Sequence, residues 1–143
     1  MTTAPRLLAG ALFATLVLAG ECKAQSPIDG GRLSGPDLAR RIEAAHAFPL
    51  GSRENPVRVD RPPGQRAYLS RLRCAGGGPP DFNRVGSFGS GPFGSIIDGY
   101  ELRCAGEGRG SRIFLDMYHP EHREDAAPPG FTIAPPRLPG TPT

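Results

Sequence analysis

The amino-acid sequence predicts an α+β fold: one N-terminal helix packed on a small, mainly antiparallel sheet of four to five strands, with one disulfide. Three observations support this prediction. Residues 35–47 place apolar side chains at helical spacing, several later segments alternate apolar and polar side chains, and Cys74 and Cys104 form an even pair. A chain of 143 residues with 20 Gly and 17 Pro has room for one small domain, which excludes barrel and two-domain enzyme folds.

Residues 1–24 have the features of a secretory signal peptide. Arg6 gives the start a positive charge, and residues 7–20 form an uncharged apolar run that is too short to span a bilayer. The small side chains of Cys22 and Ala24 suit cleavage after Ala24, and residues 17–19 offer an alternative site. The sequence therefore predicts a periplasmic or extracellular protein without a transmembrane segment in the mature chain.

A lipid anchor through Cys22 is the less favoured alternative. Lipoprotein signals place a small residue directly before the lipid-bearing cysteine, whereas Glu21 occupies that position here. The charge of Glu21 is expected to block lipoprotein processing.

A single domain is predicted over residues 34–133, between a flexible lead-in at 25–33 and a Pro-rich flexible tail at 134–143. Ser34 is expected to cap the helix at 35–47, because Ser is favoured at that position and Pro and Asp follow it in the first turn. The helix is expected to end before the next Pro.

Six segments are strand candidates because apolar and polar side chains alternate in them. They are residues 57–59, 66–74, 82–88, 96–104, 112–118 and 131–133. In the second segment, alternation places Tyr68 and Leu72 on one face and Leu69 on the other. The third is a weaker candidate because Gly86 interrupts it.

A disulfide between Cys74 and Cys104 is expected, since an exported chain folds in an oxidising compartment and cleavage of the leader removes Cys22. Both cysteines stand in a Leu-Arg-Cys-Ala-Gly sequence, so each is expected to end a strand before a Gly-rich turn. Bridged Cα atoms lie about 4.4–6.8 Å apart, which disfavours a flat three-strand meander through residues 82–88.

The charge balance argues against nucleic acid as a partner. Removing the leader from 17 basic and 14 acidic residues leaves 15 Arg and 13 acids, a net charge of only +2. Four of these arginines are candidates for binding an anionic partner if they share one sheet face: Arg71, Arg73, Arg103 and Arg112. The alternative is cross-strand pairing with Glu101 and Asp116 on a solvated face.

Two aromatic residues lie in a Gly- and Ser-rich stretch at residues 86–95. Phe88 and Phe93 are candidates for docking a partner, and the alternative is that they fold back onto the core. The stretch lacks the Lys of a phosphate-binding loop and enters an apolar strand rather than a helix, so nucleotide binding is not expected.

Asp116, His119 and His122 form the densest cluster of potential metal ligands. A carboxylate and two imidazoles are suitable zinc ligands, and Glu121 is a potential base beside them. Pro120 prevents the two imidazoles from sharing a regular helix face, so the cluster lacks the spacing of a zinc-hydrolase helix motif. The alternative is a strand end that runs into a polar turn.

Residues 54–59 (ENPVRV), 68–74 (YLSRLRC) and 116–120 (DMYHP) resemble a group of small, exported, uncharacterised proteobacterial proteins. The resemblance covers residues 54–133. It implies export and a compact disulfide-bearing domain, and it carries over no catalytic residue.

The sequence thus favours a small exported protein without enzymatic activity or a cofactor, a monomer that binds a protein or an anionic envelope component. This expectation rests on the absence of a nucleophile motif and of a cofactor fingerprint from the sequence. The alternative is a metal-dependent hydrolase that uses Asp116, His119 and His122 with zinc.

Overall fold

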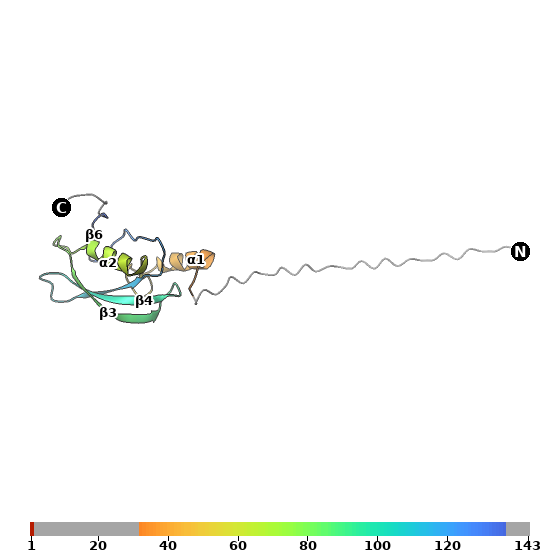
Figure 1. The fold of residues 1–143 in the computed structure, drawn as a ribbon, viewed down its shortest axis with the longest axis horizontal. Coiled ribbons are helices and arrows are strands. Elements are labelled where there is room, and N and C mark those ends of the chain that lie inside the picture. Colours follow the sequence, from red (N-terminus) through yellow and green to blue (C-terminus); the bar gives the residue numbers. More distant parts are fainter. Residues whose placement is uncertain (2–31, 137–143) are drawn as a thin grey trace.

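A computed structural model describes Met1 and residues 32–136 of the chain (Figure 1). The predicted signal peptide, most of the lead-in and residues 137–143 of the predicted tail lie outside these residues. The elements are α1 (Gly35–Ala45), β1 (Val57–Arg58), α2 (Arg61–Arg71), β2 (Leu72–Arg73), β3 (Asp81–Ser90), β4 (Ile96–Arg103), β5 (Ser111–Asp116) and β6 (Thr132–Ile133). Neither helix has the length and apolarity that a membrane span requires.

The mixed α/β architecture contains a four-stranded sheet in the order β1-β5-β4-β3 and a separate two-stranded sheet of β2 and β6. The pairs β3–β4, β4–β5 and β2–β6 are antiparallel, whereas β1 runs parallel to β5. In the second half of β4 the predicted alternation is confirmed, because Tyr100 and Leu102 are buried and Arg103 is exposed, whereas residues 97–100 are all buried. This sheet therefore has one face covered by apolar packing, as alternation predicts.

The prediction of a strand at residues 66–74 is wrong, because most of this segment belongs to helix α2. Pro62 and Pro63 stand in the first turn, where proline suits a helix start. Tyr68, Leu69 and Leu72 then follow at helical spacing and are all buried. The same residues also fit a period of two, and burial of Leu69 together with Tyr68 decides for the helix.

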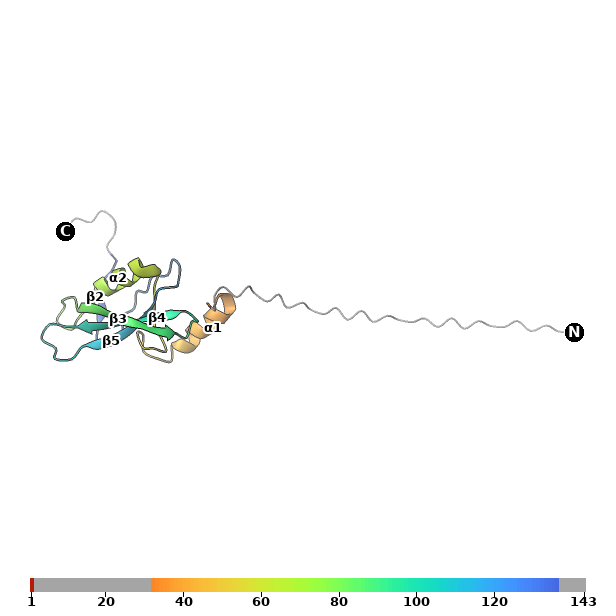
Figure 2. The same cartoon turned by 60° about the horizontal axis from the view of Figure 1, so that its bottom comes forward.

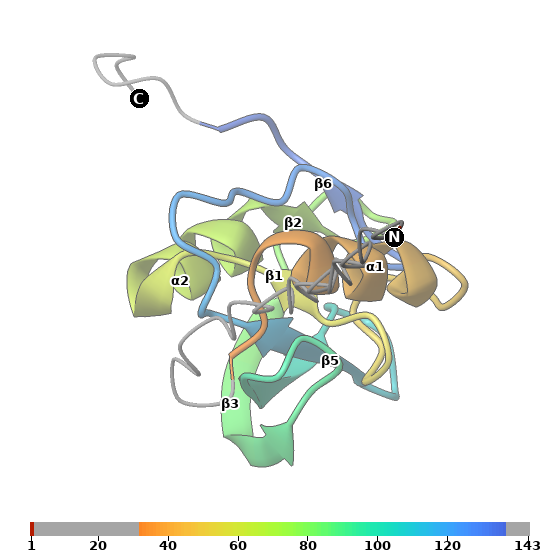
Figure 3. The same ribbon diagram turned by 90° about the vertical axis from the view of Figure 1, so that its right-hand side faces the viewer.

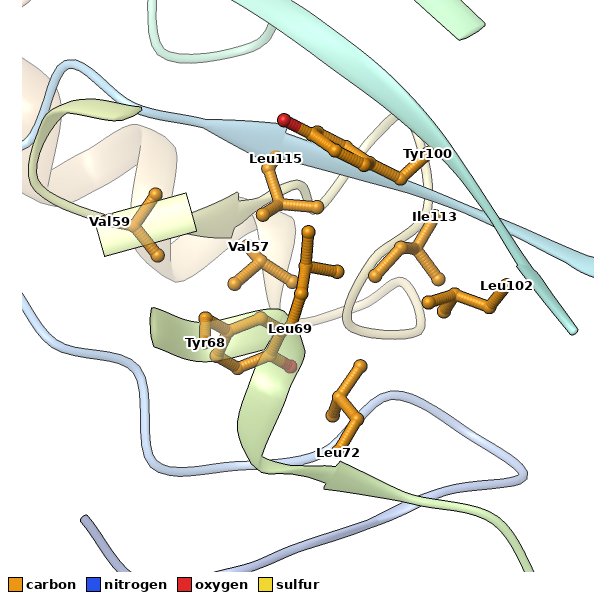
Figure 4. Packing of buried hydrophobic residues seen from close by; sticks show 9 residues of the cluster. All are labelled: Val57, Val59, Tyr68, Leu69, Leu72, Tyr100, Leu102, Ile113 and Leu115. Carbon is orange, nitrogen blue, oxygen red and sulfur yellow. The ribbon is translucent and has the colours of Figure 1, made fainter. Parts of the chain in front are cut away.

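Helix α2 packs its buried face against the sheet (Figures 1 and 4). Figure 4 shows the side chains of α2 and Leu72 directed toward those of β1, β4 and β5. The core cluster consists of Val57, Val59, Tyr68, Leu69, Leu72, Tyr100, Leu102, Ile113 and Leu115. The four-stranded sheet thus buries one face beneath the helix that follows β1.

Helix α1 forms where it was predicted but ends at Ala45, and its predicted packing on the sheet is not confirmed. It contributes no residue to the core cluster, and Ala45 is its one buried residue. Figures 1 and 2 place α1 beyond one end of the sheet, whereas α2 covers the sheet face. Ser34 stands at the predicted cap position without a side-chain capping hydrogen bond.

A buried polar network attaches α2 to the sheet. Asp98 of β4 accepts a hydrogen bond from Gln65 of α2 (3.0 Å), and the Gln65 carbonyl accepts one from Tyr100 (3.0 Å). The other Asp98 oxygen accepts hydrogen bonds from Arg84 (2.8 Å) and Ser87 (3.1 Å) of β3. Burial acts to raise the pKa of Asp98, but the bonds from Arg84, Gln65 and Ser87 outweigh it and hold this pKa below 3.8.

The predicted disulfide between Cys74 and Cys104 is present, with the two Cα atoms 5.9 Å apart. Each cysteine directly follows a strand, β2 or β4, and its carbonyl accepts a backbone hydrogen bond from the turn that comes next. Since β2 and β4 belong to different sheets, the disulfide joins the two sheets of the fold.

Candidate functional site

The four candidate arginines do not share one sheet face. Arg71 ends α2 and Arg73 lies in β2, while Arg103 and Arg112 lie in β4 and β5. Arg103 and Arg112 both pair with Glu101, at 3.4 and 3.2 Å. The cross-strand pairing with Glu101 that the sequence left open is therefore present for Arg112, whereas Arg103 lies in the same strand as Glu101. The pairing with Asp116 is absent, because Asp116 is buried and contacts none of these four arginines.

The two candidate phenylalanines fold back onto the protein. Phe93 is 1% exposed and packs edge-on against the ring of His119, with centroids 5.4 Å apart. Phe88 is half-buried and packs edge-on against Phe114, at 5.1 Å. Its ring also covers Gly99, where a Cβ atom would overlap it, so this position requires glycine. Burial of Phe93 removes it from contact with a partner.

The three candidate metal ligands lie close together at the end of β5, namely Asp116, His119 and His122. Both oxygens of the Asp116 carboxylate, however, already accept hydrogen bonds. Asp116 is fully buried, and its two oxygens accept hydrogen bonds from the Ser95 hydroxyl (2.6 Å) and the Tyr118 backbone N–H (3.0 Å). His119 Nε2 lies 3.3 Å from Asp116 Oδ2 without the alignment of a hydrogen bond. The rings of His119 and His122 are 6.4 Å apart. Among residues 32–136, no group of three or more His, Cys, Asp or Glu side chains has an arrangement that could hold a metal ion.

His122 reaches a groove that the sequence did not reveal. This α2 groove has a volume of about 720 Å³ and is lined by side chains from three segments, residues 59–73, 121–124 and 134–136. Helix α2 forms one wall, and the chain after β5 passes beside it on its way to β6 (Figure 3). Gly64, Ala67 and Ser70, spaced three residues apart along α2, leave room on this wall because their side chains are small.

The floor and walls of the α2 groove are held in place by buried contacts. Tyr68 donates a hydrogen bond to the Ala126 carbonyl (2.9 Å), and burial, followed by the charge of Glu124, raises the pKa of its phenol. Arg71, 12% exposed, donates to the Ala134 carbonyl (2.8 Å), and Ala134 N–H donates to the Arg71 carbonyl (2.8 Å). The first residues of the predicted tail, 134–136, therefore form part of the groove.

Two residues at the groove have strained backbone conformations. Arg61 (φ 57°) and Glu121 (φ 62°) are the non-glycine residues with positive φ in the described part of the chain, and both line the groove. The Glu121 backbone lies beside the carboxylate of Asp60, which accepts two hydrogen bonds from Arg61, each 2.9 Å long. The bonds from Arg61 are the main reason that the pKa of Asp60 lies below 3.8. Strained non-glycine residues cluster at functional sites, which singles out this end of the groove.

Replacing Glu121 by Gly is expected to raise the free energy of unfolding by about 1 kcal/mol. His122 N–H donates to the His119 carbonyl (3.1 Å) across a turn with Pro120 second and Glu121 third, a position that favours glycine when φ is positive. Urea unfolding measures the change. Glu107→Gly is the control, since Glu107 is exposed in a turn without positive φ. An unchanged or lowered stability of Glu121→Gly would show that the glutamate conformation carries no strain.

The charges of the groove divide between its two ends. At the N-terminal end of α2, the formal charges of Asp60, Arg61 and Glu121 sum to −1. No cation among the described residues lies within ion-pair distance of Glu121. At the other end, Arg71 and Arg123 share Asp125 at 2.7 and 3.2 Å, and the charge of Glu124 balances the remaining positive charge. The groove therefore has an acidic end, and its other end is basic only through Arg73.

Arg73 adds to the basic end. Its guanidinium donates to the carbonyls of Ser70 (2.9 Å) and Leu72 (2.7 Å), and in the described ranges no carboxylate pairs with it. His122 lies along the rim, where burial and the nearby charge of Arg58 lower the pKa of its imidazole, so that it is neutral at neutral pH.

Sequence reasoning missed the groove because its wall was predicted as a strand. With a strand predicted at residues 66–74, the spacing of Gly64, Ala67 and Ser70 did not indicate a helix face. A helical period applied from Arg61 onward places these three residues on one face, and that signal was present in the sequence.

Comparisons of the chain with known proteins found no relative. No family model matches it, and neither a curated protein nor a solved structure matches it. The functional assignment of this protein therefore rests on its own residues and geometry.

Proposed function

We propose that this protein is a small exported binding protein without enzymatic activity, and that the α2 groove is its binding site. The observation that carries the proposal is the groove itself: its volume of about 720 Å³ lies within the range of about 300–1,000 Å³ that is usual for ligand sites. An ordered helix and the chain beside β6 form its walls, so the site is largely preformed. Preformed concave sites with charged groups at their rim are typical of binding proteins.

The hydrogen-bond partners of the buried polar side chains favour binding over catalysis. The Ser95 hydroxyl donates to Asp116 rather than to His119, so these three residues do not form a nucleophile activated by an imidazole base. All three are buried away from solvent. Tyr68, which borders the groove, is 1% exposed and has a raised pKa, so its hydroxyl remains protonated and donates to the Ala126 carbonyl.

Filling the groove with a large side chain tests whether it is the binding site. Ala67 is exposed on the groove wall, so Ala67→Trp is expected to block the groove without disturbing the core. Asn83→Trp on the exposed strand β3 is the matched control. Photocrosslinking from Ser70 in living cells should give a defined adduct that Ala67→Trp abolishes and Asn83→Trp retains. Equal adduct formation in both variants would contradict the groove as the site.

Export of the protein is expected to occur with cleavage near Ala24. The charged start and the apolar run of the leader support this, as does the disulfide, since disulfides form in oxidising compartments. Intact-mass analysis of protein from the periplasm and the medium should give the mass of residues 25–143. Retention of residues 1–24, or a diacylglycerol group on Cys22, would reject the prediction.

The second candidate, a metal-dependent hydrolase that uses Asp116, His119 and His122, is favoured by one observation. The Nε2 atoms of both imidazoles are buried without a hydrogen-bond partner among the described residues. Because Asp116 has both oxygens engaged, we expect zinc titration to show no stoichiometric binding in the wild type or in a His119→Ala/His122→Ala variant. Stoichiometric zinc that is lost in the variant would favour the hydrolase instead.

A further inference from the structure

We propose that the ligand of the α2 groove is an extended polypeptide segment with a cationic group at one end and a carboxylate about five residues away. This inference rests on the proposed function and specifies its partner. Three features of the groove support this inference: its length, the separation of Glu121 from Arg73 and the apolar residues in its lining.

The length follows from α2, which forms one wall. A helix of 11 residues is about 16 Å long at 1.5 Å per residue. Glu121 lies at the N-terminal end of this wall, because it contacts Asp60 directly before α2. Arg73 lies just beyond the other end. An extended peptide rises about 3.3 Å per residue, so about five residues connect the two charges.

The charge pattern favours a ligand that carries both signs. Among the charged residues that line the groove, Glu121 and Arg73 have no ion-pair partner within the described ranges, whereas Arg61 pairs with Asp60 and Arg71 with Asp125. Glu124 also lines the groove, but its carboxylate accepts hydrogen bonds from the backbone N–H groups of Asp125 and Ala126 and lies 3.7 Å from the neutral imidazole of His122. A ligand cation near Glu121 and a ligand anion near Arg73 would give each of these charges an ion-pair partner. Polyanions are disfavoured because they would bring negative charge against Glu121 at the acidic end.

The stretch between the two ends favours a polypeptide with small or apolar side chains. Pro63, Ala67, Pro135 and Pro136 are among the residues that line the groove. Proline carries no backbone N–H, so these walls offer apolar contact rather than a sheet edge. The expected partner is therefore an extended peptide segment. Its charged ends provide the specificity of binding, and its central residues contribute apolar contact area.

Four acetylated, amidated pentapeptides with three central Ala residues test the proposal, titrated into the mature protein and followed by ¹⁵N NMR. Their end residues are Lys and Asp, Asp and Lys, two Lys, or two Asp. One of the two mixed-charge peptides should bind about three- to tenfold more tightly than either like-charge peptide, as expected for two exposed ion pairs. The affected resonances should be those of groove residues.

Charge variants make the test independent of the direction of the peptide. Glu121→Lys should change the preference to the peptide with two Asp, and Arg73→Glu should change it to the peptide with two Lys. Glu107→Lys is the control, because it makes the same charge change at an exposed turn outside the groove.

The outcomes separate this inference from the proposed function. If the groove resonances shift equally with all four peptides, the charge pattern is overturned and the groove remains the binding site. If no peptide shifts them at 5 mM, or if inorganic phosphate shifts them at lower concentration than any peptide, the polypeptide partner is overturned. If in addition Ala67→Trp leaves the crosslinked adduct intact, the proposed function itself fails.

Discussion

Replacing Cys74 and Cys104 together by Ser is expected to lower the melting temperature of the mature protein by more than 10 °C. The two residues are 30 positions apart, and closing a loop of this length stabilises a domain by about 3–4 kcal/mol in the chain-entropy model. In a domain of about 100 residues, 1 kcal/mol corresponds to roughly 4–8 °C. The disulfide also ties β2 to β4, so its loss removes a covalent link between the two sheets.

Thermal unfolding followed by circular dichroism measures this effect. A reducing agent should lower the melting temperature of the wild type to that of the double variant and leave the variant unchanged, which separates loss of the bond from an effect of the serine side chains. Overlapping melting curves of the oxidised wild type and the variant would show that the core is stable without the disulfide.

Replacing Asp98 by Ala is expected to lower the free energy of unfolding by about 2–4 kcal/mol. The variant removes the acceptor for Gln65, Arg84 and Ser87 at once and leaves the buried Gln65 amide without its partner. Since Arg84 is 48% exposed, water compensates part of its lost bond, and most of the cost comes from Gln65 and the emptied space. Urea unfolding measures the change, with Asp81→Ala at an exposed position of β3 as the control.

The contribution of Asp98 also depends on pH. Because its pKa is lowered in the folded state, this contribution is present above about pH 4 and is lost as the pH falls through the folded-state pKa. The stability difference between the wild type and Asp98→Asn should therefore shrink below pH 4. A difference that stays constant from pH 7 to pH 2.5 would mean that the carboxylate charge does not hold α2 on the sheet.

Local sequence patterns predicted much of the fold. The second half of strand β4 follows its alternation of polar and apolar residues, because one face there is buried and the other is more polar. The helix at Gly35–Ala45 and the disulfide were also predictable, the first from helical spacing and the second from an even cysteine count.

Residues 68–72 by themselves could not identify α2, since they satisfy both a period of two and a helical period. Only the position of a sheet beneath both Tyr68 and Leu69 distinguishes the two. The roles of Phe93 and Asp116 likewise depended on burial, because each was a candidate for contact with a partner or a metal until its neighbours were known.

By itself, the sequence determined the cysteine pairing of this protein and the strands that have one polar face, and its predicted leader, apart from Met1, lies outside the described residues. The tertiary structure decided the rest: which helix covers the sheet, and the existence of the α2 groove. The physical reason is that spacing along the chain records local periodicity, whereas the groove is formed by segments 59–73, 121–124 and 134–136, which come together only when α2 buries its apolar face.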